Sequence, residues 1–199
     1  MAGSVGRMAS GLGRYGVFRL AVVRLRMRGI LLIAVVLTGC SRGLTVPEVG
    51  QGGPDFDPVR FFSGHVRSWG VMEDRGGQPT GIVTTDCEGV ADGPDGLLMT
   101  QRLVVDGRPS VRVWRMRRVG AGRFEATAND MVGIATGEAS GRAFQWHWTL
   151  ALSPGNWLEN VDMEQWWYLQ DDGSMLNRTI IRKVGVVVAE VTEHFVPVR

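Results

Sequence analysis

The sequence has 199 residues, with 22 basic and 20 acidic side chains and a formal net charge of +2. Residues 1–39 hold six arginines and no acidic residue, so the remaining 160 residues carry 16 basic against 20 acidic side chains, a net charge of −4. The basic character therefore belongs to the leader, and it gives no support to nucleic-acid binding by the rest of the chain. A segment of this length suits one domain.

An apolar run of eight residues, 30–37, follows a group of arginines near the start of the chain. A membrane-spanning helix needs roughly 20 apolar residues, so this run is too short to remain in a bilayer. It has the length of the hydrophobic region of a signal peptide, with a positive flank before it. The run ends in "LTGC" at Cys40, which resembles the lipobox of bacterial lipoproteins.

The lipobox resemblance implies a signal peptide over residues 1–39, cleavage before Cys40, and acylation of Cys40, which would attach the protein to a membrane. Two or more acyl chains are needed because a single chain binds only marginally. Ser41 follows in place of the aspartate that retains lipoproteins at the inner membrane, so we expect the outer membrane, on the side facing the periplasm. A start at Met27 would give a compact lipoprotein signal and is an alternative to Met1.

Residues 40–58 are predicted to be the lipidated cysteine and a flexible tether, because "GLTVPEVGQGGPDFDP" (43–58) is rich in glycine, proline and acids without a sustained period. The domain itself is then expected over 59–199. Cys87 has no second cysteine to pair with if Cys40 carries lipid, and we expect it to be a small buried hydrophobic residue.

Short apolar runs alternate with turn signals such as "DRGGQP", "ADGPDG" and "QDDGS" through the rest of the chain, which favours an antiparallel all-β fold. The predicted strands are 61–72, 81–88, 97–105, 111–118, 123–128, 132–138, 143–152, 158–169, 175–183 and 186–196. About ten strands are enough to close a barrel or to fold over as a sandwich. The segment 183–191 could be partly helical, but its valines favour a strand.

The clearest strand is "AFQWHWTLAL" (143–152), whose aromatic and polar residues alternate with a period of two. The chain has seven tryptophans. A tryptophan-rich, glycine-punctuated β chain has the composition of a lipocalin-like barrel, which can hold one small apolar ligand. The tryptophans could line a cavity or could fill a small core, and the sequence favours neither decisively.

Three segments carry a resemblance to a known family: "FFSGHVRSWGVMEDRGG" (61–77), "VWRMRRVGAGRFEATANDMVGIATGEASGRAFQWHWTL" (113–150) and "WWYLQDDGSMLNRTIIRKVGVVVAEVT" (166–192). They resemble the domain-of-unknown-function family 3833, a group of bacterial lipoproteins. The most specific pieces are the Phe-Phe-x-Gly start, the Val-Gly-x-Ala-x-Gly segment at 132–137, and the segment from Asp-Asp-Gly through Lys-x-Gly. The resemblance implies export, lipidation and a β-rich domain, and it supplies no catalytic residues.

Catalytic signatures are weak. The sequence has no Gly-x-Ser-x-Gly elbow, no Cys-x-x-Cys pair and no His/Cys cluster typical of zinc. The aspartate pairs lie beside glycine or proline, where aspartate shapes turns. We therefore expect no cofactor and no metal, and a binding protein rather than an enzyme.

The leading hypothesis is a membrane-anchored lipoprotein whose barrel binds an apolar or amphiphilic small molecule, or a partner protein of the envelope. The predicted ligand-binding residues are four tryptophans that would form the apolar walls of a pocket and one arginine that would make a polar contact with the ligand (the polar handle): Trp114, Trp146, Trp148, Trp166 and Arg115. One alternative is an enzyme acting on a lipid-like substrate, using Arg115, His147 or Glu138 inside the barrel. The other is a structural envelope protein with a filled core. The sequence leaves the ligand and the oligomeric state open.

Overall fold

The computed structural model describes residue 43 and residues 45–198, and the compact unit that it contains begins at residue 44. This unit is all-β apart from three short helical turns. The strands are β1 Gly64–Asp74, β2 Pro79–Ala91, β3 Gly96–Val105, β4 Arg108–Gly120, β5 Arg123–Ala128, β6 Met131–Ser140, β7 Ala143–Leu150, β8 Val161–Leu169, β9 Met175–Lys183 and β10 Val186–Pro197. The helical turns are α2 Val46–Val49, α3 Pro58–Phe61 and the 3₁₀ turn η1 Trp157–Glu159.

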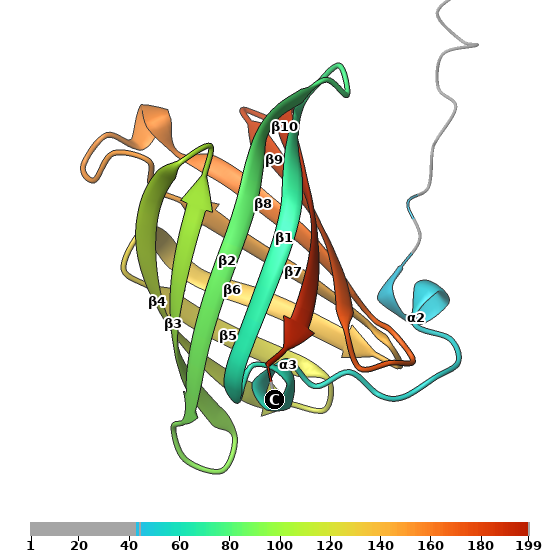
Figure 1. Ribbon diagram of the computed structural model, residues 1–199. Helices are drawn as coiled ribbons and strands as arrows, with labels where there is room; N and C mark the ends of the chain where they lie inside the picture. The colour runs from blue at the N-terminus through green and yellow to red at the C-terminus, as the bar shows by residue number, and fades with distance from the viewer. Residues whose placement is uncertain (1–42, 44, 199) are drawn as a thin grey trace, which may run out of the picture. The chain divides into compact units, whose positions relative to one another are not determined.

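The ten strands close into one antiparallel barrel in which each strand pairs with its neighbours in sequence, and β1 pairs with β10 to complete the ring (Figure 1). Closure leaves no unpaired edge, which removes the edge-to-edge association to which open sheets are prone. The predicted all-β barrel of about ten strands is confirmed. The segment 183–191 contains the end of β9 and most of β10, so the strand interpretation of its valines is correct.

At three ends the predicted strands run too far, whereas at several other ends the observed strands extend one to three residues beyond the predicted limits. The strand expected from residue 61 begins at Gly64, because Pro58 starts α3 and the Asp57 side chain caps that helix by accepting from Val59 N (3.0 Å) and Arg60 N (3.3 Å). The strand expected over 143–152 ends at Leu150, and the one expected from 158 begins at Val161. The first of these strands ends before a bend and turn over residues 152–155, and the start of the second is displaced by η1, which Asn156 caps.

The segment predicted to be a flexible tether packs against the barrel over residues 45–58. Phe56 is only 4% exposed and lies among the rings of Phe61, Phe144 and Trp167. Its backbone N–H donates to Gly141 O at 2.7 Å. The prediction was wrong for these residues because composition alone does not show that one buried aromatic ring outweighs a glycine- and proline-rich setting. The compact unit therefore starts before the predicted residue 59.

Helix α3 lies at the lower end of the barrel in Figure 1. Phe61 of α3 and Phe62 after it belong to an aromatic cluster formed by Phe56, Phe61, Phe62, Phe144, Trp167 and Phe195. Phe62, directly after α3, packs edge to face with Trp167 (5.3 Å between centroids) and with Phe195 (5.9 Å). A side chain at Gly89 would meet the Phe62 carbonyl oxygen at 2.0 Å, so glycine at this point of β2 allows the α3 segment to approach.

Candidate functional site

The barrel interior contains a buried carboxylate, Glu193 of β10, which is 7% exposed. Its Oε1 accepts hydrogen bonds from Ser68 Oγ at 2.7 Å and from Thr85 Oγ1 at 3.0 Å. Its Oε2 accepts one from Asn177 Nδ2 at 3.0 Å. The three donors come from β1, β2 and β9, so the barrel closure itself assembles this site.

All three partners of Glu193 are neutral. Within the described part of the chain, Glu193 takes part in no ion pair at a distance of 4.0 Å or less. Burial raises the pKa of Glu193 above its ordinary value, and the hydrogen bonds from Ser68, Thr85 and Asn177 act in the opposite direction. An acid of this kind costs stability and is characteristic of functional sites.

Glycine at position 70 makes the space for this acid. An added Cβ there would lie 2.6 Å from Glu193 Cγ and 2.2 Å from the Thr192 carbonyl oxygen. Since both distances are far below van der Waals contact, any larger residue on β1 at this point would displace the carboxylate.

A chain of polar side chains runs from Glu193 toward the tryptophans. Asn177 Nδ2 also donates to Thr179 Oγ1 at 3.1 Å, and Gln165 Nε2 donates to the same hydroxyl oxygen at 3.0 Å. Gln165 Oε1 in turn accepts from Trp148 Nε1 at 2.9 Å. The indole ring is thereby fixed in orientation by a network that ends at the acid.

Arg112 stacks on two of the interior tryptophans. Its guanidinium carbon lies 4.5 Å from the Trp148 ring centroid and 5.5 Å from that of Trp114. Its Nε donates to both oxygens of Asp130, at 2.7 and 2.9 Å. The positive charge of Arg112 is therefore matched by a neighbour and by two ring faces.

These groups enclose a cavity of about 40 Å³. At 10 to 15 Å³ per water, it has room for about three water molecules. This is much less than the roughly 300 Å³ or more of ordinary ligand pockets. The cavity is lined by Phe62, Met99, Gln101, Arg112, Trp114, Met116, Trp146, Gln165, Trp167, Asn177, Glu193 and Phe195.

Three of the predicted walls face the interior: Trp114, Trp146 and Trp148 are all buried. The prediction was wrong for Trp166, which points outward. Its ring stacks on that of Tyr168 (6.3 Å between centroids), and its Nε1–H donates to Glu164 Oε1 at 2.9 Å. The next residue, Trp167, takes the interior position. Two adjacent tryptophans cannot both face inward on a strand, and the phase is set by Val161 and Met163.

The predicted polar handle, Arg115, also points outward, with Asp92 Oδ2 3.5 Å from its Nε. Arg112 takes the interior place, because it lies two residues from Trp114 and therefore on the same face of β4. His147 and Glu138, expected inside the barrel in the enzyme hypothesis, are both exposed on its outer surface. The polar groups of the interior, Arg112 and Glu193 among them, were not among the predicted site residues.

The missed acid had a signal in the sequence. In "VTEHFV" the residues Val191, Glu193 and Phe195 alternate with Thr192 and His194. The glutamate thus occupies the apolar face of a period-two strand, which is unusual for an ionisable residue. Asn177 sits in the same way on the inner face of β9.

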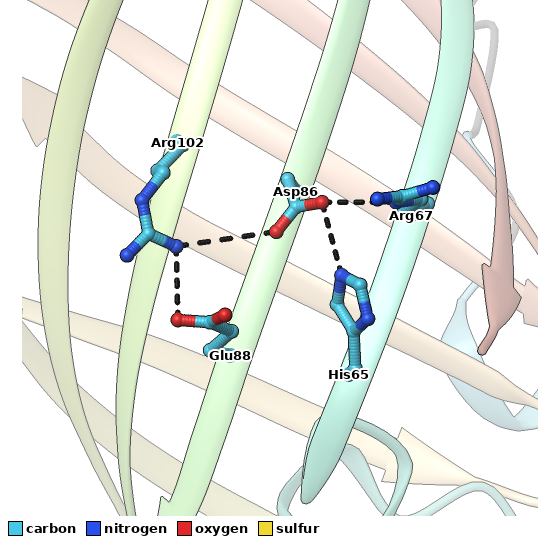
Figure 2. A network of polar contacts seen from close by, with 5 residues as sticks. All are labelled: His65, Arg67, Asp86, Glu88 and Arg102. Carbon is cyan, nitrogen blue, oxygen red and sulfur yellow. Dashed lines mark hydrogen bonds and ion pairs between the residues drawn. The ribbon is translucent and has the colours of Figure 1, made fainter. Parts of the chain in front are cut away.

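A second polar network lies on the outer surface of β1, β2 and β3 (Figure 2). Asp86 Oδ2 is 2.9 Å from His65 Nε2 and 3.0 Å from Arg67 Nε, and Arg102 NH1 is 2.9 Å from Glu88 Oε2. The contact with His65 is the largest cause that lowers the pKa of Asp86. Opposite charges alternate across the strands, so this network supports strand pairing.

Other features of the described residues bear on the earlier expectations. Cys87 is fully buried and burial raises the pKa of its thiol, which confirms it as a core residue. No group of three or more His, Cys, Asp or Glu side chains able to hold a metal ion occurs among the residues that the structure describes. In the same part of the chain, no helix is long and apolar enough to cross a membrane. Cys40 and the predicted signal peptide lie outside the described residues.

The family model described as "Protein of unknown function (DUF3833)" matches residues 34–196. The chain belongs to this family. No curated protein matches it in sequence.

Among solved structures, it is similar to Rv2717c from M. tuberculosis, with 16% identity, a TM-score of 0.54, and coverage of 73% of this chain and 100% of that one. It is also similar to the S-type phycobiliprotein lyase CPES from Guillardia theta, with 11% identity, a TM-score of 0.52, and coverage of 71% and 90%. At these identities the similarity shows a shared barrel fold.

The structure gives a physical reason for the family segment at 132–137. Gly133 has a φ of 72° within the irregular stretch where the β6–β7 register shifts. Ala135 is fully buried, and a Cβ at Gly137 would lie 2.2 Å from Trp146 Cε3 and 2.3 Å from Phe144 Cζ. The small residues of β6 therefore leave room for the rings of β7, which form one wall of the interior.

Proposed function

We propose that this protein is a lipoprotein of the bacterial outer membrane, anchored through acyl groups on Cys40 and facing the periplasm, whose barrel binds a small apolar or amphiphilic molecule. In this proposal residues 1–39 are removed and the barrel carries the activity without chemical conversion of the ligand. The lipobox resemblance and the family membership support the anchor.

The observation that carries the binding proposal is the convergence of an uncompensated acid and three tryptophans on one cavity, with a fourth tryptophan, Trp148, packed against Trp114. A barrel of this size could be filled with aliphatic side chains. Here Trp114, Trp146 and Trp167 line the space beside Glu193, and Trp148 lies directly beneath Arg112. Ligand sites combine apolar walls with a few fixed polar groups in this way.

The size of the cavity defines what binding requires. About 40 Å³ accepts only a few non-hydrogen atoms, so a larger ligand must displace an interior side chain. Arg112 is the candidate for that movement, because its head group stacks on ring faces and pairs with a partly exposed aspartate rather than packing in the core. In the proposed mode the ligand enters on the Arg112 side and its polar group reaches Glu193.

The binding proposal is tested by native mass spectrometry and tryptophan fluorescence of the chain from Ser41 onward. We expect a co-purified small molecule, and a fluorescence change when it is removed and returned. Trp148→Phe should reduce that change, whereas Trp166→Phe, on the outer surface, should preserve it. A protein that is consistently empty and has fluorescence insensitive to added amphiphiles would contradict the proposal.

The anchor is tested separately by labelling cells with radiolabelled fatty acid. Cys40→Ala should abolish labelling, and Cys87→Ala is the matched control that should retain it. Continued labelling of the Cys40→Ala variant would refute the lipid anchor.

A second function is favoured by the cavity volume. At about 40 Å³ the interior is nearly filled, as expected for a structural envelope protein with a solid core. The two functions differ in outcome, because a structural role predicts no specific ligand and no effect of interior polar substitutions other than on stability.

A further inference from the structure

The ionisable groups of the interior are unequally compensated. The Arg112 guanidinium is held by Asp130 at 2.7 Å and stacks on two tryptophans. Glu193 has only hydroxyl and amide donors. When Glu193 is ionised, the interior therefore carries one negative charge that no cation of the described chain neutralises at contact distance.

The two oxygens of Glu193 are not equivalent. Oε1 accepts two hydrogen bonds, from Ser68 and Thr85, neither of which lines the cavity. Oε2 accepts only one, from Asn177, which does line the cavity. A carboxylate has about four lone-pair sites, so the chain leaves Oε2 able to accept a further hydrogen bond from the cavity side.

The walls around this oxygen are aromatic. Trp114, Trp146 and Trp167 line the same cavity, together with Phe62 and Phe195. Faces of aromatic rings attract organic cations, tryptophan most strongly, and the attraction increases when water is excluded. A buried carboxylate with a free acceptor site beside such rings matches an alkylammonium group in both charge and shape.

We propose that the interior site recognises a small alkylammonium group, which donates an N–H to Glu193 Oε2 and rests its carbon atoms against the tryptophans. This inference rests on the proposed function and adds the chemical class of the ligand. The cavity has room for the head group, and a longer alkyl tail occupies the space under Arg112 once that side chain moves.

The experiment uses three molecules of similar length that differ in charge: n-butylammonium, 1-butanol and butyrate. Each is titrated into the full-length protein in a nonionic detergent at constant ionic strength, and tryptophan fluorescence is recorded with potassium chloride as the inorganic control. We expect saturable binding of butylammonium at least about tenfold tighter than that of butanol, and no saturable effect of butyrate or potassium.

Glu193→Gln should weaken butylammonium binding by roughly tenfold or more, while leaving the affinity for butanol little changed. Glu190→Gln is the control on the same strand, since Glu190 pairs with Arg178 on the outer surface. Affinity of the unaltered protein for butylammonium should also fall as the pH is lowered and Glu193 gains a proton. The other titratable groups of the interior are Arg112, which lines the same cavity, and the Cys87 thiol on β2, whose pKa is raised by burial.

The outcomes separate the two proposals. Equal binding of butanol and butylammonium, tighter binding of butyrate, or an unaffected Glu193→Gln variant would overturn the ammonium class while the barrel remains a binding protein. Binding of none of the three, together with an empty protein in native mass spectrometry, would overturn the proposed function as well. The pH series on the unaltered protein decides the matter if the Glu193→Gln variant does not fold.

Discussion

Replacing Gly137 with alanine tests whether the interior wall of β6 and β7 is packed as tightly as the structure indicates. The added methyl group would lie 2.2 Å from Trp146 Cε3 and 2.3 Å from Phe144 Cζ. Carbon atoms pack best at roughly 3.5 to 4.0 Å, so both rings would have to move by more than an ångström. Phe144 is fully buried and Trp146 is 1% exposed, which leaves them little room for that movement.

Overpacking of a core costs about 1 to 3 kcal/mol, and two obstructed rings place Gly137→Ala near the upper end of that range. For a domain of this size each kcal/mol lowers the midpoint of thermal unfolding by about 2 to 4 °C, so we expect a loss of roughly 6 to 12 °C. The assay is thermal and urea unfolding followed by circular dichroism. A change that lowers the urea midpoint without altering the slope reports stability alone.

The control is Thr136→Ala, one residue away and exposed on the outer face of β6, which should change stability by no more than about 0.5 kcal/mol. Combining Gly137→Ala with Phe144→Leu removes one of the two clashes, so the double variant should lose less than the sum of the single losses. A Gly137→Ala protein as stable as its parent would refute the reasoning, because it would mean that the rings can shift freely and that the interior is looser than described.

Three further results are expected. Burial raises the pKa of Glu193 above its ordinary 4.5, so the unaltered protein should lose stability as the pH rises from that value through the folded-state pKa. Glu193→Gln removes this titration, so the free energy of unfolding of the variant, measured with urea at several pH values, should rise relative to that of the parent over the same pH window. If the two free energies instead change in parallel with pH, the burial of this charge would be contradicted. Trp167→Ala should lower the free energy of unfolding by about 3 to 5 kcal/mol in the same assay, and Trp166→Ala by no more than about 1.5 kcal/mol. The reverse order would mean that Trp166, and not Trp167, faces the interior. The Cys87 thiol should react with a thiol reagent only when the barrel opens, at a rate that rises with denaturant, and rapid labelling of the native protein would contradict its burial.

The strands could be predicted because their signals are local. Period-two alternation and glycine- or aspartate-containing turns act over a few residues, and each of the ten predicted segments overlaps one strand of the barrel. The errors at residues 61 and 158 fall where a capping side chain, Asp57 or Asn156, starts a helical turn instead, and the one at residue 152 falls at the turn before η1. Burial of Cys87 was predicted from its residue type, because a cysteine without a pairing partner is usually a small buried residue, and it lies on the inner face of β2.

The site was predicted only in part. Trp114, Trp146 and Trp148 could be assigned to an interior because each stands on an alternating strand. In β8 two tryptophans are adjacent, so the sequence does not show which of them faces the interior, and the prediction of Trp166 was wrong. The packing of Phe56 into the aromatic cluster could not be foreseen, because its partners come from β7 and β8, more than 80 residues further along the chain.

The sequence by itself determined the alternation of side chains along each strand, the places where the chain turns, and the resemblance of "LTGC" to a lipidation signal. Only the tertiary structure decided that Ser68, Thr85 and Asn177 meet around Glu193, and that this acid shares a nearly filled cavity with the tryptophans. The physical reason is that alternation depends on neighbours in sequence, whereas closure of β1 on β10 brings together Ser68 and Glu193, which lie 125 positions apart.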